Sequence, residues 1–168
     1  KIYAFITPSK FTKDTIQQSN QFKNSNFYHA PTFIDKAERL TKKNRDYNTK
    51  EIIKFCYVGR IADDKGIDIL IEAINKLSDK DLNIQVDIYG DDKNQYAQEQ
   101  LNTVNKLKLQ NIEFKGYVKA STINEVFEKY HYSIIPSKWY DNMPNSLIES
   151  SINGIPVIVS SIGSLGEL

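Results

Sequence analysis

From Ile52 onward, the sequence alternates short runs of β-branched and aromatic residues with longer segments of helical periodicity. This alternation is typical of parallel strands joined by crossover helices. The predicted strands are Ile52 to Val58, Ile84 to Tyr89, Ile112 to Lys115, Tyr132 to Ile135 and Pro156 to Val159. The helices predicted between them are Gly66 to Leu77, Gln95 to Leu107, Thr122 to Tyr130 and Pro144 to Asn153. We therefore expect an α/β fold with a doubly wound, Rossmann-like parallel sheet.

The chain divides into three parts by composition. Residues 1–33 predict a separate small unit with a strand in "IYAFITPS", a helix capped at Ser9 and a short strand near "NFYHAP". Residues 34–50 hold nearly all of the charged stretch "DKAERLTKKNRDYNTKE" and predict a solvated linker or a surface helix. Residues 51–168 hold the α/β pattern. The sequence begins at Lys1 inside a predicted strand and ends just after another strand and a glycine turn. We therefore expect an excised piece of a longer protein, with its sheet incomplete at both ends.

Charge and hydropathy exclude several classes of protein. The chain carries 22 Lys and Arg against 21 Asp and Glu, which argues against a nucleic-acid-binding surface. No apolar run approaches the roughly 20 residues of a membrane span, and the N-terminal text lacks the layout of a signal peptide. The single cysteine, Cys56, is interpreted as a small core residue of a protein in a reducing compartment. A cytoplasmic location is expected.

Ligands of open parallel sheets bind outside the carboxyl ends of the strands. After the first predicted strand comes "VGRIADDKG", in which Gly59 allows the backbone to turn. Arg60 supplies a planar guanidinium and Lys65 a point charge, a combination suited to a diphosphate. Taken alone, Arg and Lys at strand ends are usually ordinary solvated surface residues. The acids Asp63 and Asp64 are interpreted as caps of the next helix rather than as metal ligands.

The segment "PSKWYDNMPNSLIE" follows the fourth predicted strand. If Pro144 starts a helix, the first free N–H groups of that helix point toward the sheet edge and favour an anion. Asp141 precedes this helix and Glu149 lies about one turn inside it, so the two carboxylates can accept hydrogen bonds from a polyhydroxylated ligand. The alternative is that Asp141 caps the helix and Glu149 is solvated. The adjacent Trp139 and Tyr140 either brace the loop against the sheet or reach a membrane-bound lipid.

Four ordered segments resemble a known family. They are "YVGRIADDKGIDILIEAINKL", "VDIYGDD", "NIEFKGYV" and "IIPSKWYDNMPNSLIESSINGIPVIVSSIGSLGEL". Their order and spacing are similar to the C-terminal half of retaining glycosyltransferases with the GT-B fold, in the large family 4. The text "FITPSKFTKDTI" resembles the end of that family's N-terminal domain, on the acceptor side. The resemblance implies a retaining, hexosyltransferase-like enzyme of polysaccharide biosynthesis, of which this piece alone binds the nucleotide-sugar donor weakly and transfers little sugar.

The resemblance also implies roles for individual residues. Arg60 and Lys65 match the basic pair that holds the donor diphosphate and stabilises its charge as the glycosidic bond breaks, so they are the expected catalytic residues. Glu149 matches the glutamate that holds the ribose, and Asp141 falls where a glutamate normally contacts the sugar. The main chain at Tyr117 and Val118 is expected at the base, and amides of residues 142–145 at the sugar and phosphates. The full expected donor-binding set is Gly59, Arg60, Lys65, Tyr117, Val118, Asp141, Asn142, Met143, Pro144, Asn145, Ser146 and Glu149.

Two departures from the family pattern stand out. Asp141 keeps the carboxylate of the expected glutamate but shortens its reach by one methylene, and "TFID" replaces the family's usual "NGID" near the hinge. Because fixed cations and a helix end handle the leaving-group charge, no metal and no other cofactor is expected. The expected partners are a nucleotide-sugar donor and an acceptor saccharide or lipid-linked glycan, the acceptor being bound by the rest of the N-terminal domain. Peripheral association of the full-length protein with the inner face of a membrane would accompany a lipid-linked acceptor.

Two other classes compete with this reading. A non-catalytic flavodoxin-like binding or regulatory module would use the strand-end acids Asp91 and Asp92 and leave Arg60 incidental. A nicotinamide-dependent oxidoreductase is disfavoured because no G-x-G-x-x-G segment follows any strand. Nucleotide binding separates the transferase from the module.

Overall fold

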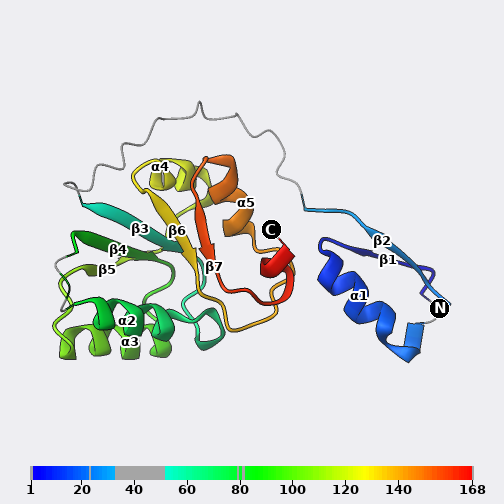
Figure 1. The fold of residues 1–168 in the computed structure, drawn as a ribbon, viewed down its shortest axis with the longest axis horizontal. Coiled ribbons are helices and arrows are strands. Elements are labelled where there is room, and N and C mark those ends of the chain that lie inside the picture. Colours follow the sequence, from blue (N-terminus) through cyan, green and yellow to red (C-terminus); the bar gives the residue numbers. More distant parts are fainter. Residues whose placement is uncertain (1, 23, 33–51, 79, 81, 168) are drawn as a thin grey trace.

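The computed structural model describes residues 2–22, 24–32, 52–78, 80 and 82–167 (Figure 1). The predicted linker and most of the "TFID" segment lie outside these residues. Residues 2–22 and 24–32 form a small unit in which two parallel strands, β1 (Ala4–Thr7) and β2 (Asn26–His29), pair beside helix α1 (Lys10–Gln18) and the short turn η1 (Asn20–Phe22). Ser9 caps α1 by accepting a hydrogen bond from the Thr12 N–H at 3.1 Å, as its position before the helix predicted.

The larger unit is a five-stranded, fully parallel sheet with the strand order β5-β4-β3-β6-β7. Its strands are β3 (Ile53–Val58), β4 (Ile84–Tyr89), β5 (Ile112–Gly116), β6 (Tyr132–Ile135) and β7 (Val157–Val159). Its helices are α2 (Ile67–Leu77), α3 (Gln95–Lys106), α4 (Ile123–Phe127) and α5 (Asn145–Ile152), with the short turns η2 (Asp63–Lys65), η3 (Ala120–Thr122) and η4 (Gly163–Glu167). The doubly wound parallel sheet predicted from the sequence is confirmed.

The helices cover both faces of the sheet (Figure 1). On one face, α2 and α3 pack Ile67, Ile71 and Ala97 against Val86 and Ile88 of β4. On the other, α4 packs against β3, where successive strand residues point to opposite faces. Cys56 is fully buried there, as expected for a core residue. None of the described helices is long and apolar enough to cross a bilayer.

The third crossover helix differs from the sequence-based prediction. Residues 120–122 form a 3-10 turn, and α4 is a short helix that ends at Phe127. Thr122 and Glu125 have the spacing of a capping box, but the Thr122 hydroxyl donates to the carbonyl of Lys119 instead. No capping box forms, because the 3-10 turn offers the hydroxyl a local backbone acceptor.

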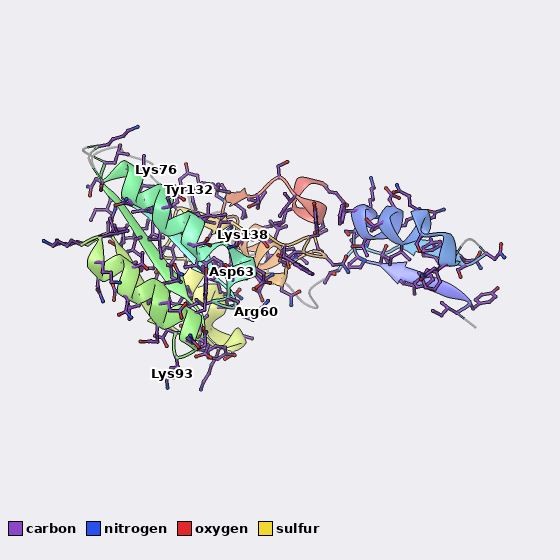
Figure 2. The ribbon with its side chains drawn as sticks, turned by 90° about the horizontal axis from the view of Figure 1, so that it is seen from below. Arg60, Asp63, Lys76, Lys93, Tyr132 and Lys138 are labelled. Carbon is purple, nitrogen blue, oxygen red and sulfur yellow. The ribbon has the colours of Figure 1, made fainter. Side chains whose placement is uncertain are left out.

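The strand order reverses between β3 and β6, and the loops after these two strands meet at that point. Gly66 makes the meeting possible: it has a φ of 70°, and a Cβ there would lie 1.9 Å from the Pro136 carbonyl oxygen. The Lys138 N–H donates to the Asp64 carbonyl at 2.9 Å, and the Lys138 ammonium binds the Asp63 carboxylate at 2.6 Å (Figure 2). The β3–η2 loop and the β6–α5 loop are thus joined into one sheet edge.

Candidate functional site

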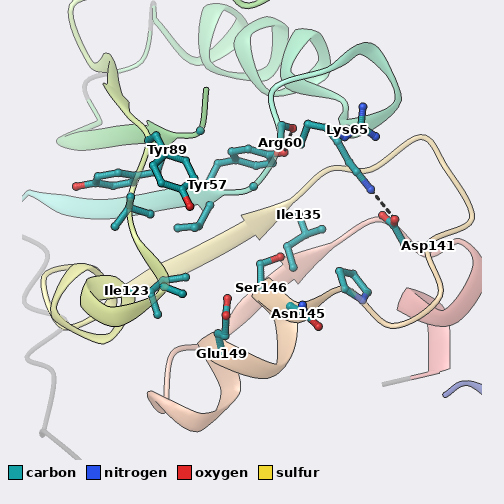
Figure 3. A pocket seen from close by; sticks show the side chains of 17 residues that line it. Tyr57, Arg60, Lys65, Tyr89, Ile123, Ile135, Asp141, Asn145, Ser146 and Glu149 are labelled. Carbon is teal, nitrogen blue, oxygen red and sulfur yellow. Dashed lines mark hydrogen bonds and ion pairs between the residues drawn. The ribbon is translucent and has the colours of Figure 1, made fainter. Parts of the chain in front are cut away.

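A cavity of about 380 Å³ opens at this edge, between the ends of β3, β4 and β5 and the start of α5 (Figure 3). Ten of the residues that the sequence analysis singled out line it: Gly59, Arg60, Lys65, Tyr117, Val118, Asp141, Pro144, Asn145, Ser146 and Glu149. Residues from three separate loops therefore share one pocket at the switch point of the sheet, where this fold class binds its ligands.

One side of the cavity, the cationic half, holds Arg60, Lys65 and Asp141. The Lys65 ammonium donates a hydrogen bond to Asp141 Oδ1 (Figure 3). The Arg60 guanidinium lies at the rim, where Nη2 is 2.7 Å from Asp64 Oδ2 and 63% of the side chain is exposed. Lys65 is only 19% exposed. Both cations line one cavity, and each already has a carboxylate partner.

Asp141 does not cap a helix, which answers the alternative left open by the sequence. Its Oδ1 accepts from Lys65, and its Oδ2 accepts from the Ser137 hydroxyl at 2.8 Å. The side chain is 14% exposed. A carboxylate held at both oxygens in a partly buried position has a fixed orientation, because each hydrogen bond restricts its rotation.

The start of α5 presents free backbone donors to the cavity. Pro144 has an extended backbone, with φ −65° and ψ 137°, so it stands just before the first helical residue, Asn145. It carries no side-chain cap. Among the described residues, no carbonyl accepts from the N–H groups of Asn145 and Ser146, the orphan donors of a helix start. Such a terminus favours an anion.

The other side, the carboxylate half, holds Glu149 with Tyr117 and Val118. Glu149 lies inside α5 and is partly buried, and burial raises the pKa of its carboxyl above the ordinary value. Within the described part of the chain, the Glu149 carboxylate accepts no hydrogen bond and forms no ion pair. Tyr117, in the sequence-distant β5–η3 loop, lines the same cavity and is 76% exposed. An unpaired, partly desolvated carboxylate is suited to accept hydrogen bonds from ligand hydroxyls.

Two predicted residues do not reach the cavity. The Asn142 Oδ1 faces α1, where it accepts from the hydroxyls of Ser9 and Thr12. The Met143 N–H donates to Ser164 Oγ at 2.8 Å, and its side chain packs beside Leu147. Asn142 and Met143 are not among the residues that line the cavity, and Met143 has a positive φ of 66°. Donor binding by their amides remains a prediction.

Sequence reasoning missed several lining residues: Tyr57, Val58, Tyr89, Gly90, Ala120, Ile123 and Ile135. Tyr57 positions the strand end, because its hydroxyl donates to the Arg60 carbonyl at 2.6 Å, and burial raises the pKa of that phenol. Tyr89 contacts the hydroxyl of Tyr130 at 2.8 Å, and Tyr130 donates to the buried Asp87 at 2.6 Å. Tyr89 and Gly90 end a correctly predicted strand, so their position was an available signal. No signal in the sequence indicated the contacts of the tyrosine hydroxyls.

Asp91 and Asp92, which the flavodoxin-like alternative would use, have local structural roles. Asp91 accepts from the Lys93 N–H at 3.1 Å, and the Asp92 carbonyl accepts from Gln98 at 2.6 Å, so both stabilise the turn before α3. Neither lines the cavity. Among the described residues, no three His, Cys, Asp or Glu side chains gather in a group that could hold a metal ion.

Comparison with known proteins agrees with this geometry. A family model described as "Glycosyl transferases group 1" matches residues 53–168. An uncharacterized glycosyltransferase of Methanocaldococcus jannaschii is 31% identical over 116 residues, which are 67% of this chain and 28% of that protein. The chain spans about a third of the length of the curated relatives it matches.

Two solved structures share the fold. A glycosyltransferase from Rickettsia africae superposes with a TM-score of 0.80 at 17% identity, over 98% of this chain and 46% of that one. A variant of S. aureus TarM, in complex with fondaparinux, alpha-GlcNAc-glycerol and UDP, gives a TM-score of 0.74 at 25% identity, over 94% and 29%. These neighbours have the parallel-sheet architecture of GT-B glycosyltransferases. Because the family model covers most of the sequence, this chain belongs to the glycosyl transferases group 1 family.

Proposed function

We propose that the cavity binds a nucleotide-sugar donor and that the full-length protein transfers the sugar, with retention of configuration, to a polysaccharide, glycolipid or small acceptor. One observation carries this proposal. Lys65, the free amides of α5 and the unpaired Glu149 line a single cavity at the switch point of the sheet. Cations and helix amides suit a diphosphate, and a carboxylate suits the hydroxyls of a ribose. The TarM variant of similar fold was solved with UDP.

The residues receive distinct roles in this proposal. Arg60 and Lys65 bind the diphosphate, with the Asn145 and Ser146 amides completing its coordination. During transfer, the bond between the anomeric carbon and the diphosphate oxygen breaks. A bond from that carbon to an acceptor hydroxyl oxygen forms on the same face of the sugar, and the hydroxyl proton passes to the departing diphosphate. Negative charge develops on the departing diphosphate. Fixed cations and a helix end stabilise that charge in place, without a metal ion.

The remaining components follow from the same proposal. Tyr117 and Val118 border the base, Glu149 binds the ribose, and Asp141 faces the sugar. The acceptor, a saccharide or a lipid-linked glycan, binds mainly to parts of the protein other than residues 52–168. Membership of family 4, a role in polysaccharide biosynthesis and a cytoplasmic site of action, at the inner face of the membrane for a lipid-linked acceptor, belong to the proposal as well.

Calorimetric titration of the protein with UDP, GDP and ADP tests the binding step. We expect one nucleotide to bind, and Arg60→Ala and Glu149→Ala each to weaken it by roughly 1.5 to 3 kcal/mol if charge-assisted hydrogen bonds form. Binding should persist in EDTA. NMR analysis of the anomeric configuration of the product formed by the full-length protein tests retention. Absence of nucleotide binding by the full-length protein, or an inverted product, would contradict the corresponding part of the proposal.

A further inference from the structure

Both neighbours of Asp141 in the chain contact helix α1 of the N-terminal unit. The Tyr140 ring stacks on Phe11, with ring centroids 5.4 Å apart and an interplanar angle of 16°. On the other side, Asn142 Oδ1 accepts hydrogen bonds from Thr12 Oγ1 at 2.6 Å and from Ser9 Oγ at 3.1 Å. The loop that carries Asp141 is therefore held on both sides of that residue by a helix more than 120 positions away in sequence.

The same loop is held from behind by η4. The buried Ser164 hydroxyl accepts from the Met143 N–H at 2.8 Å and donates to the Asp141 carbonyl. The Glu167 carboxylate accepts from the N–H groups of Lys10 and Phe11, the first residues of α1. A carboxylate at a helix N-terminus is favoured by the unsatisfied amides and by the helix dipole. Residues 140–143 thus lie between α1 and η4, which also contact each other.

The backbone of this loop needs such support. Met143 has a φ of 66°, a left-handed conformation that costs a non-glycine residue of order 1–3 kcal/mol and persists only where the surroundings enforce it. The turn directs Asn142 toward α1 while Asp141, one residue earlier, meets Lys65 and Ser137 inside the cavity. The hydrogen bonds within the loop, from the Asp141 N–H to the Trp139 carbonyl and from the Ser137 hydroxyl to Asp141 Oδ2, lie before the turn at Met143. The turn itself is held by the bonds of Asn142 to α1 and of Met143 to η4. Contact with α1 therefore contributes to the position of the Asp141 carboxylate.

We propose that α1 positions the sugar end of the donor site from outside it, with Thr12, Ser9 and Asn142 as positioning residues that act through Asp141. This inference rests on the proposed function of the cavity. None of the described residues of the N-terminal unit lines the cavity, so α1 acts through the loop alone. Glu149 and Tyr117 lie on other elements, α5 and the β5–η3 loop. Because loss of a contact with α1 leaves the bonds of Asp141 to Lys65 and Ser137 in place, we expect the helix to affect how the sugar is held more than the affinity for the nucleotide.

The test compares affinity for a nucleoside diphosphate with affinity for its sugar conjugate in the full-length protein. The pairs are UDP with UDP-glucose, GDP with GDP-mannose and ADP with ADP-glucose, and the pair that the wild type binds best is then used. Thr12→Val is nearly isosteric and removes the hydroxyl that reaches Asn142. Thr12→Ser restores that hydroxyl. Thr15→Val is the matched control, because the Thr15 hydroxyl donates to the Phe11 carbonyl within α1 at 2.8 Å.

We expect Thr12→Val to lower affinity for the nucleotide sugar about fivefold, as for one lost hydrogen bond, and to leave nucleoside diphosphate affinity within about twofold. Thr12→Ser should return both to wild-type values, and Thr15→Val should change neither. Asn142→Ala should resemble Thr12→Val, and the double variant should lose no more than either alone. An unchanged ratio of the two affinities in Thr12→Val, with the nucleotide still bound, would overturn this inference and leave the proposed function standing. Failure of the wild type to bind any of the nucleotides would overturn the proposed function and the inference together.

Discussion

The two halves of the cavity satisfy their charges differently. In the cationic half, Lys65 is paired with Asp141 and Arg60 with Asp64. In the carboxylate half, Glu149 has no partner among the described residues, and burial raises its pKa. A ligand that enters the first half must displace existing ion pairs, whereas a ligand that enters the second supplies hydrogen bonds that the protein lacks. The cationic half should therefore determine how tightly the phosphates bind, and the carboxylate half should add affinity for the rest of the nucleotide.

Replacing Lys65 should break the cationic half and have the largest effect. Lys65→Met removes a partly buried ammonium that faces the expected diphosphate and leaves Asp141 with Ser137 as its hydrogen-bond partner. We expect binding of UDP and of inorganic pyrophosphate to weaken by about 2–3 kcal/mol each, measured by calorimetry. The control is Lys76→Met, since that α2 lysine is 71% exposed and pairs with Glu72 outside the cavity. Equal effects of the two substitutions would mean that Lys65 has no special role.

A change at Glu149 should separate the two halves. Glu149→Gln keeps the size of the side chain but removes its charge, so each hydrogen bond from a ribose hydroxyl becomes weaker. We expect UDP binding to weaken by about 1.5–2 kcal/mol and pyrophosphate binding to stay within measurement error. Titration of one protein preparation with both ligands gives the comparison. A parallel loss for pyrophosphate would place Glu149 at the phosphates and refute the division of the cavity.

Neutralising Asp141 should strengthen the binding of phosphate in the cationic half, whereas replacing Lys65 should weaken it. Asp141→Asn weakens the ion pair that occupies Lys65 and removes an acid from the path of an incoming anion. We expect pyrophosphate to bind more tightly, by about 0.2–1 kcal/mol, the range measured for single ion pairs near a surface. Binding that is weaker than in the wild type would show that Asp141 orients Lys65 for the anion more than it competes with it.

The smallest expected effect is on the pH dependence of stability. Because the Glu149 pKa is raised in the folded state above its ordinary value of 4.5, the unfolded chain releases that proton first as pH rises. The wild type should therefore lose stability relative to Glu149→Gln as pH rises from about 4 toward neutrality. Urea unfolding of both proteins across this range measures the difference. A difference that stays constant with pH would mean that the carboxylate is fully solvated.

Local patterns in the sequence were sufficient for most of the fold. The strands Ile84–Tyr89 and Tyr132–Ile135 have the predicted bounds, since a run of β-branched and aromatic residues between turn residues leaves few other choices. The helix predicted from Thr122 to Tyr130 is longer than α4, because the apolar spacing continues through Tyr130 while Lys129 and Tyr130 bond to carbonyls three residues back and not four. Tyr130 is buried, and its hydroxyl donates a hydrogen bond to the buried Asp87. The position of Asp87 in a predicted strand does not indicate that it pairs with Tyr130.

The site was predictable to the extent that strand order places loops together. Parallel strands bring their carboxyl ends to one edge, so Arg60, Lys65 and Glu149 could be expected in one pocket before any distance was known. Side-chain pairing could not be expected, because the Lys65–Asp141 contact depends on how the two loops meet at Gly66. The contacts of Asn142 with α1 depend on the left-handed backbone of Met143. A methionine in the sequence does not predict that conformation.

The most direct test is a crystal structure of the protein with UDP, or with whichever nucleoside diphosphate calorimetry shows to bind. We predict that the diphosphate lies between Lys65 and the amides of Asn145 and Ser146, that Lys65 has left Asp141, and that Glu149 accepts hydrogen bonds from the ribose hydroxyls. A diphosphate bound elsewhere, with the Lys65–Asp141 pair intact and Glu149 facing solvent, would contradict the assignment of this cavity.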